Sequence, residues 1–141
     1  MKSIVCGAGV VGSSIAKKLS EEGLDVTVID QSTELLKKIN DKLDVKTILG
    51  SGSTPSTLKL AGANDCDLII AVTKSDEVNM IICQISNTVF KVPTKIARIR
   101  QQEYLQTDWI NYKENHLPID IIISPEVEVA KAISRRLHAP G

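Results

Sequence analysis

The sequence predicts a doubly wound α/β fold, in which a parallel sheet of six strands carries helices on both faces. Short apolar runs alternate with segments of helical period six times along the chain. Several runs, such as CDLIIAV at 66–72, are apolar at consecutive positions, which is typical of strands buried on both faces. A strand and helix repeated in this way favour parallel strands joined by crossover helices.

The predicted elements follow one another in regular order. The strands are expected at 3–6, 25–29, 46–49, 66–72, 94–99 and 119–123. The helices are expected at 10–23, 32–43, 55–62, 75–90, 101–112 and 125–137. Residues typical of helix ends support these boundaries: Gly23 follows the first helix, and Ser32 precedes the second. Pro55, capped by Thr54, and Pro125 stand where first-turn prolines belong.

Length and composition indicate one globular domain. The chain has 141 residues, of which 43% are hydrophobic and 24% are charged. Lysine plus arginine and aspartate plus glutamate balance at 17 each, so no bulk positive charge recruits nucleic acid. The first residues reach a glycine turn too soon for a signal peptide, and every apolar run is too short for a membrane span. Direct membrane insertion is therefore not expected.

The cysteines predict buried free thiols. Cys6, Cys66 and Cys83 are odd in number, lack the spacing of a metal site and lie within apolar runs. Free cysteine is among the most buried residue types, and unpaired thiols persist in reducing compartments. The pattern therefore favours the cytoplasm.

A glycine loop between the first strand and the first helix predicts a dinucleotide site. Gly7, Gly9 and Gly12 open the helix, and Asp30 ends the next strand 18 positions after Gly12. In this fingerprint the first glycine allows a tight turn, the second lets backbone approach a pyrophosphate, and the third lets helix and strand pack closely. The phosphates then face the helix N-terminus. The whole loop is predicted to bind the cofactor: Gly7, Ala8, Gly9, Val10, Val11 and Gly12.

The acidic residue that follows predicts a preference among dinucleotides. Asp30 is expected to accept hydrogen bonds from the adenosine ribose, and its charge would repel the extra phosphate of NADP. The neighbouring Gln31, a further predicted binding residue, and Ser32 supply no compensating base. NAD or NADH is therefore the expected cofactor. ATP or ADP is the alternative, because Asp30 would hold their ribose equally well.

The residue types needed for catalysis are sparse. His116 precedes the sixth strand, His138 lies near the chain end, and neither is paired with a carboxylate in the sequence pattern. Tyr104 and Tyr112 lack the lysine four residues on that a tyrosine–lysine proton relay requires. We therefore expect a binding protein and no enzyme. A small NAD-dependent oxidoreductase and a scaffold that has lost its ligand remain alternatives.

Four segments together carry a family resemblance. They are CGAGVVGSSIAKKLSEEGLDVTVID, GSGSTPSTLKLAGANDCDLIIAVTKSDEVNMIIC, IARIR and IIISPE. This combination resembles the N-terminal domain of RCK (regulator of K+ conductance) proteins, also called the KTN or TrkA-N domain, across essentially the whole chain. It is most similar to that domain in Trk-type potassium-uptake regulators. The resemblance implies a Rossmann-type domain over 1–141 that forms part of a longer regulatory protein.

The resemblance extends the predicted site beyond the glycine loop. Gly50 and Ser51 match a family position after the third strand that contacts the adenine side and usually reads Gly-Asp, so an expected acid is missing here. Thr73 resembles the family threonine near the phosphates, and Asn79 belongs to a motif that resembles the family's D-E-x-N. Arg98 is implied to point toward the phosphates, with Arg100 as the solvated alternative on the same side of the strand.

Other acidic residues have a simpler interpretation. Asp76 and Glu77 fall in a first helical turn, where the helix dipole alone explains acids. Glu126 matches a family position that helps to bind a divalent cation in some members, but one carboxylate makes only a weak metal candidate. The helix expected at 125–137 resembles the family's crossover helix, which packs on a neighbouring subunit, although core packing within one chain would give the same apolar pattern.

The resemblance implies a role as well as a fold. It points to a regulatory domain that senses a nucleotide, assembles into a dimer or larger ring, and gates a potassium transporter or channel subunit in the membrane. Such a domain would be cytoplasmic and held at the inner face of the cell membrane through its partner. A ligand gates such an assembly only if it binds its two states unequally.

Overall fold

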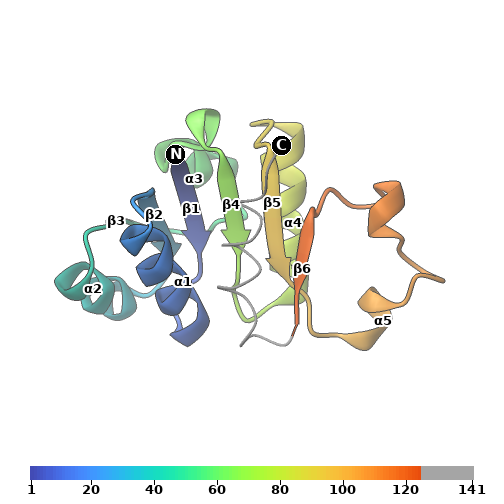
Figure 1. Cartoon of the computed structure of the whole chain (residues 1–141), viewed down its shortest axis with the longest axis horizontal. Coiled ribbons are helices and arrows are strands. Elements are labelled where there is room, and N and C mark those ends of the chain that lie inside the picture. The colour runs from blue at the N-terminus through green and yellow to red at the C-terminus, as the bar shows by residue number, and fades with distance from the viewer. Residues whose placement is uncertain (125–141) are drawn as a thin grey trace.

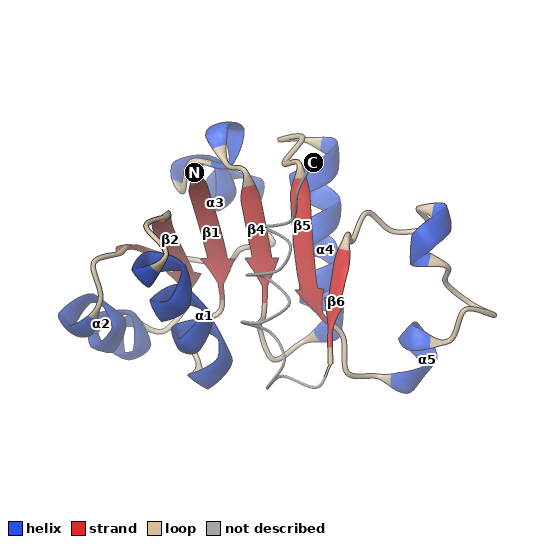
Figure 2. Ribbon diagram, viewed as in Figure 1, coloured by secondary structure: helices blue, strands red, loops and turns tan. Residues whose placement is uncertain are grey.

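The protein folds around a parallel sheet with the strand order β3-β2-β1-β4-β5-β6 (Figure 1). The structure is a computed structural model, and it describes residues 1–124. The predicted helix at 125–137, Pro125 and the metal candidate Glu126 lie outside the described residues. All five neighbouring strand pairs are parallel, and Figure 2 shows the arrows of β1, β4 and β5 pointing the same way. This arrangement confirms the predicted doubly wound α/β class.

Within residues 1–124 the elements alternate as predicted, except in the segment 101–112. The strands are β1 Lys2–Cys6, β2 Asp25–Asp30, β3 Lys46–Leu49, β4 Leu68–Ala71, β5 Thr94–Arg98 and β6 Ile121–Ile123. The helices are α1 Val10–Glu21, α2 Thr33–Lys42, α3 Pro55–Leu60, α4 Asp76–Thr88 and α5 Gln102–Leu105, with short 3-10 turns η1 Ala63–Asp65 and η2 Tyr112–Glu114.

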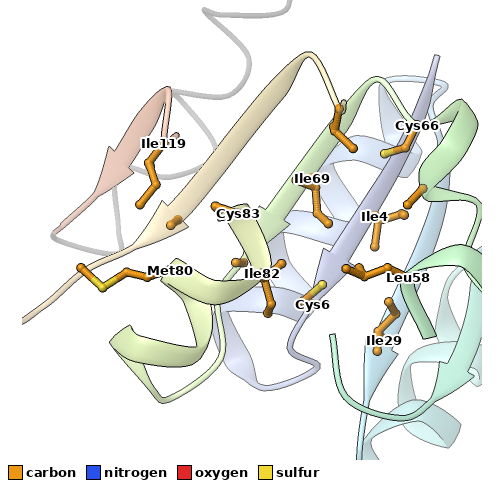
Figure 3. Close-up of a cluster of buried hydrophobic side chains, with 14 of the residues drawn as sticks. Ile4, Cys6, Ile29, Leu58, Cys66, Ile69, Met80, Ile82, Cys83 and Ile119 are labelled. Atoms are coloured by element: carbon orange, nitrogen blue, oxygen red, sulfur yellow. The ribbon is translucent and has the colours of Figure 1, made fainter. Parts of the chain in front are cut away.

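Two hydrophobic clusters, one on each face of the sheet, explain the consecutive apolar residues of the strands. Alternate residues of β4 point to opposite faces: Leu68 and Ile70 join the cluster under α1 and α2, whereas Ile69 and Ala71 join the cluster under α3 and α4. Figure 3 shows the second cluster, and Figure 2 shows the helices on both sides of the strands. Helices on both faces therefore remove the polar alternation that a half-exposed strand would show.

All three thiols are free and lie in the second cluster, as Figure 3 shows. Burial raises the pKa of Cys66 to about 11 and that of Cys83 to about 12, and it raises the pKa of Cys6 further. Among the described residues, no group of three or more histidine, cysteine, aspartate or glutamate side chains is placed to hold a metal ion. The prediction of buried free thiols is confirmed.

Helix ends follow the local signals. Gly23 takes a positive φ of 87° directly after Glu22, the C-cap of α1. The Ser32 hydroxyl accepts a hydrogen bond of 3.2 Å from Leu35 N at the start of α2. Pro55 opens α3. Thr54 occupies the position before it, although its side chain makes no capping hydrogen bond within the described residues. No helix among residues 1–124 is long and apolar enough to cross a bilayer.

The helix predicted at 101–112 is wrong. Only Gln102–Leu105 is helical, and the rest of this crossover consists of turns and the η2 turn. Polar contacts hold it instead: the Tyr112 hydroxyl donates to the Tyr104 carbonyl at 3.0 Å, and Asn111 N donates to His116 Nδ1 at 2.9 Å. Several polar residues in this segment favour such local bonds over helix continuation.

Candidate functional site

A cleft lies where the order of the strands reverses. The chain leaves β1 toward β2, whereas β4 lies on the other side of β1, so the loops after β1 and β4 diverge at the lower edge of the sheet in Figure 1. The cleft has a volume of about 750 Å³. Its lining comes from loops at the carboxyl ends of five strands, at 7, 9–11, 30–32, 50–52, 73–75, 98 and 100. Open α/β sheets bind their ligands at this position.

The three glycines of the loop have different steric surroundings. Gly7 has a φ of 118°, and a Cβ there would lie 2.7 Å from the Val72 carbonyl oxygen. A Cβ on Gly12 would lie 1.7 Å from the Gly7 carbonyl oxygen, so only glycine allows α1 to start against this turn. A Cβ on Gly9 would have no atom within 4 Å, and Gly9 lines the cleft. Turn and packing therefore fix two glycines, and the third leaves the cleft open.

The N-terminus of α1 faces the cleft. Gly9 is its N-cap and has no side chain with which to cap the helix. Val10 and Val11 line the cleft, and the first turn carries no acidic residue that would offset the positive end of the dipole. Backbone N–H groups at such a terminus suit an anionic ligand.

Asp30 is tied to the glycine loop. Its Oδ2 accepts a hydrogen bond of 2.7 Å from Ala8 N, and its Oδ1 accepts one of 2.8 Å from Ser32 N. The carboxylate is half-buried and lines the cleft. Each carboxylate oxygen can accept a further hydrogen bond, so the side chain retains capacity for a ligand hydroxyl. The contact with Ala8 was not expected from the sequence.

The loop after β3 closes the same side of the cleft. The hydroxyls of Ser51 and Ser53 lie 2.8 Å apart, and Ser51 Oγ also accepts a hydrogen bond from Ser53 N. A Cβ on Gly52 would lie 2.8 Å from Cys6 Sγ, so this loop packs directly on the end of β1. Gly50, Ser51 and Gln31 all line the cleft. A pair of hydroxyls therefore occupies the place where an acid was expected.

The sequence model of the TrkA-N domain family matches residues 3–125 of the chain. The chain belongs to the TrkA-N domain family. It is 48% identical over 142 residues to the Trk system potassium uptake protein TrkA of Azorhizobium caulinodans and 45% identical over 141 residues to that of Halomonas elongata. Each match covers the whole chain but only 31% of the relative, so the chain spans about a third of the length of these relatives.

Solved structures support the fold of this TrkA-N domain. The TrkA-N domain of the inner membrane protein ybaL from Escherichia coli has a TM-score of 0.73 at 19% identity, covering 97% of this chain and 96% of that one. The GsuK channel bound to NAD has a TM-score of 0.70 at 14% identity, covering 87% of this chain and 21% of that one. At such identities the likeness shows the shared fold alone.

Most predicted site residues of this TrkA-N domain line the cleft. Three do not: Ala8, Gly12 and Asn79. Ala8 bonds to Asp30, and Gly12 packs against the Gly7 carbonyl, so both support the glycine loop without lining the cleft. Asn79 is fully buried in α4, and its amide bonds to the ends of β4 and β5.

Basic side chains gather at the opposite end of the cleft from Asp30. Arg98 is buried, and its Nη2 donates to the carbonyl oxygens of Val72 at 3.2 Å and Thr73 at 2.6 Å. Lys74 and Arg100 are exposed and also line the cleft. Sequence reasoning missed Lys74 and treated Arg100 as solvated. Their place directly after β4 and β5 is the signal that would have found them, because strand ends converge at the cleft.

The acids of the first turn of α4 contact protein groups. The Asp76 carboxylate accepts hydrogen bonds from Arg100 N at 3.1 Å and Gln101 N at 2.8 Å. Glu77 accepts one from the Tyr104 hydroxyl at 3.2 Å, and this contact raises the pKa of Tyr104. The helix dipole alone is therefore an incomplete account of these acids. They anchor the crossover that follows β5.

Proposed function

We propose that this domain binds NAD or NADH in the cleft and serves as the regulatory domain of a potassium uptake system. The observation that carries the proposal is the bond between Asp30 and Ala8 N, because it holds the ribose acceptor and the phosphate loop in one rigid unit. The adenosine ribose would bind Asp30, and the pyrophosphate would lie at the N-terminus of α1 beside Gly9.

The basic end of the cleft suits the remaining phosphate charge. Arg98 at the end of β5 lines it, together with Lys74 and Arg100 from the loops after β4 and β5. Guanidinium and ammonium groups form strong charge-assisted contacts with phosphate oxygens. The same residues favour ATP or ADP as a second candidate, because a terminal phosphate would reach them. A structural neighbour, the Kef CTD of Shewanella denitrificans, is described in an AMP-bound form.

The regulatory role is inferred from the relatives. Those with 40–48% identity over the whole chain are named potassium uptake proteins. We propose that a protein containing this domain assembles into a dimer or ring in the cytoplasm and gates a membrane potassium transporter subunit. Residues 1–141 would act as one nucleotide-sensing unit of that protein, with no catalytic role of its own. Ligands would act by binding the open and closed assemblies unequally.

Calorimetric titration with NADH, NAD, NADPH, ATP and ADP under one magnesium condition tests the ligand. Asp30→Ala should weaken binding of NADH at least about tenfold, because charged hydrogen bonds to the ribose contribute about 1.5–3 kcal/mol each. It should also abolish the preference for NADH over NADPH. Asp25→Ala, at the other end of β2, is the matched control and should change neither.

The outcomes separate the alternatives. Tighter binding of ATP than of NADH would replace the redox input with an energy-charge input. Hydride transfer from NADH to a simple carbonyl substrate would support an oxidoreductase. Absence of binding of all five nucleotides would refute the proposed function and leave a scaffold.

A further inference from the structure

Asn79 makes a complete set of hydrogen bonds beneath the cleft. Its Oδ1 accepts from Thr73 N at 2.9 Å and from Thr73 Oγ1 at 2.7 Å. Its Nδ2 donates to the Thr73 carbonyl at 3.2 Å and to the Arg98 carbonyl at 2.9 Å. The side chain is 0% exposed. One amide therefore joins the carboxyl ends of β4 and β5.

The geometry separates Asn79 from the groups that face the ligand. A primary amide has two N–H donors and two oxygen lone pairs, and all four are used here. Thr73 and Arg98, the partners in these bonds, both line the cleft. Arg98 Nη2 in turn donates to the Thr73 carbonyl at 2.6 Å. Each of the three residues is thus bonded to the other two, and only Thr73 and Arg98 line the cleft.

We propose that Asn79 is a positioning residue, which fixes Thr73 and Arg98 for a nucleotide phosphate while it touches no ligand itself. The inference rests on the proposed nucleotide binding and assigns the residues that preorganise its phosphate end. A preorganised site binds more tightly because the cost of ordering its groups is met on folding. The mixed donor and acceptor set of asparagine is required. Leucine offers neither, and an ionised aspartate would turn a second oxygen toward the carbonyls of Thr73 and Arg98.

Asn79→Asp tests this role through the pH dependence of nucleotide affinity. At about pH 8 the ionised side chain has no N–H donor, so NADH affinity should fall at least about tenfold. Burial among carbonyl oxygens favours protonation of the new carboxyl group, whereas the Arg98 guanidinium, which is bonded to the Thr73 carbonyl, opposes it. At about pH 5.5 burial should dominate and restore one donor, and affinity should return to within about threefold of the unsubstituted protein. Affinities are compared with the unsubstituted protein at each pH, and thermal unfolding confirms that both proteins are folded.

Asn87→Asp is the matched control. It introduces the same charge on the same helix, at an exposed position two turns away, and should leave affinity unchanged at both pH values. An Asn79→Asp protein that binds as the unsubstituted chain does at both pH values would overturn the inference and leave the proposed function intact. A folded protein with weak binding that does not recover at low pH would overturn it as well, because loss of packing alone would explain that result.

A measurement on the unsubstituted protein covers the case in which Asn79→Asp does not fold. Without nucleotide, the amide proton of Thr73 should already exchange slowly with solvent, because it is bonded to Asn79 Oδ1. The amides of Val10 and Val11 should slow only when nucleotide is added. Fast exchange at Thr73 in the free protein would show that Asn79 does not hold it in advance. If NADH and ATP both fail to bind, the proposed function and this role are refuted together, whatever the exchange rate.

Discussion

Alanine at Gly12 should destabilise the fold because no space exists for a side chain. A Cβ would lie 1.7 Å from the Gly7 carbonyl oxygen and 2.7 Å from its carbon, so α1 or the turn must move by more than an ångström. Forced overpacking costs up to about 3 kcal/mol. Alanine regains about 1 kcal/mol through its greater helix propensity. The expected loss in the free energy of unfolding is therefore about 2 kcal/mol.

Alanine at Gly9 should produce the opposite pattern. A Cβ there meets no atom within 4 Å, and Gly9 does not have a positive φ. Alanine is a poorer N-cap than glycine, and this difference alone should lower the free energy of unfolding by about 1 kcal/mol or less. The new methyl group would instead stand where a pyrophosphate approaches the N–H groups of α1. Nucleotide affinity should fall at least about tenfold.

Urea unfolding and calorimetric titration of both variants test this pair of predictions. The reasoning is that the two glycines serve different tasks, one in folding and one in ligand approach. A Gly12→Ala protein as stable as the unsubstituted chain would show that the turn can relax and would refute the steric argument. A Gly9→Ala protein with unchanged affinity would place the ligand phosphates away from the N-terminus of α1.

Three further changes have expected outcomes. The Ser86 hydroxyl is buried without a hydrogen-bond partner in the described part of the chain, so Ser86→Ala should raise the free energy of unfolding by about 1 kcal/mol; a loss would reveal a partner such as a buried water. Burial raises the pKa of Cys66 to about 11 from an ordinary 9.0, so the unfolded chain releases this proton first, and between about pH 9 and 11 this thiol should lower the free energy of unfolding by about 1.4 kcal/mol per pH unit. The pKa values of Cys83 and Cys6 are raised further and steepen the fall, so Cys66→Ala should make the slope shallower by about 1.4 kcal/mol per pH unit in that range. Asp76→Ala removes the carboxylate that holds the segment after β5, so limited proteolysis within 100–105 should accelerate while far-ultraviolet circular dichroism stays constant. Equal cleavage rates would show that other contacts hold that segment.

Local sequence signals predicted the parts of the site that depend on neighbouring residues. The glycine loop could be predicted because Gly7 and Gly12 have no room for a side chain, and the atoms that exclude it lie a few residues away or directly after an adjoining strand. The Ser32 cap was readable because its bond spans three positions. The bond from Ala8 N to Asp30, by contrast, joins residues 22 positions apart. The fingerprint places both residues in one site but does not state that they bond to each other.

The periodicity of apolar residues predicts helices and strands but not the contacts between residues that are far apart in the sequence. The sequence suggested that Asn79 makes a loop contact or a ligand bond, because asparagine gains little in a helix interior. In the structure its hydrogen bonds go to Thr73 and to Arg98, which lies 19 positions away. The Ser51 and Ser53 hydroxyl pair was similarly hidden, because a family comparison shows only that an acid is missing.

The first turn of α4 explains why the crossover after β5 was wrongly predicted as a helix. A helix prediction assumes that an apolar stripe against the core holds the segment in place. Here Asp76 holds the backbone at 100 and 101, and Glu77 holds Tyr104. Contacts with α4 therefore hold the start of this crossover in place, and it does not depend on a long helix packed against the core. Ser75, directly before this turn, caps α4 by accepting a hydrogen bond from Val78 N. The buried Asn79, which follows Val78, holds Thr73. The start of α4 thus holds both the loop after β4, which lines the cleft, and the crossover after β5. The sequence pattern of two acids followed by an asparagine reflects these contacts as well as the interaction of the acids with the helix dipole.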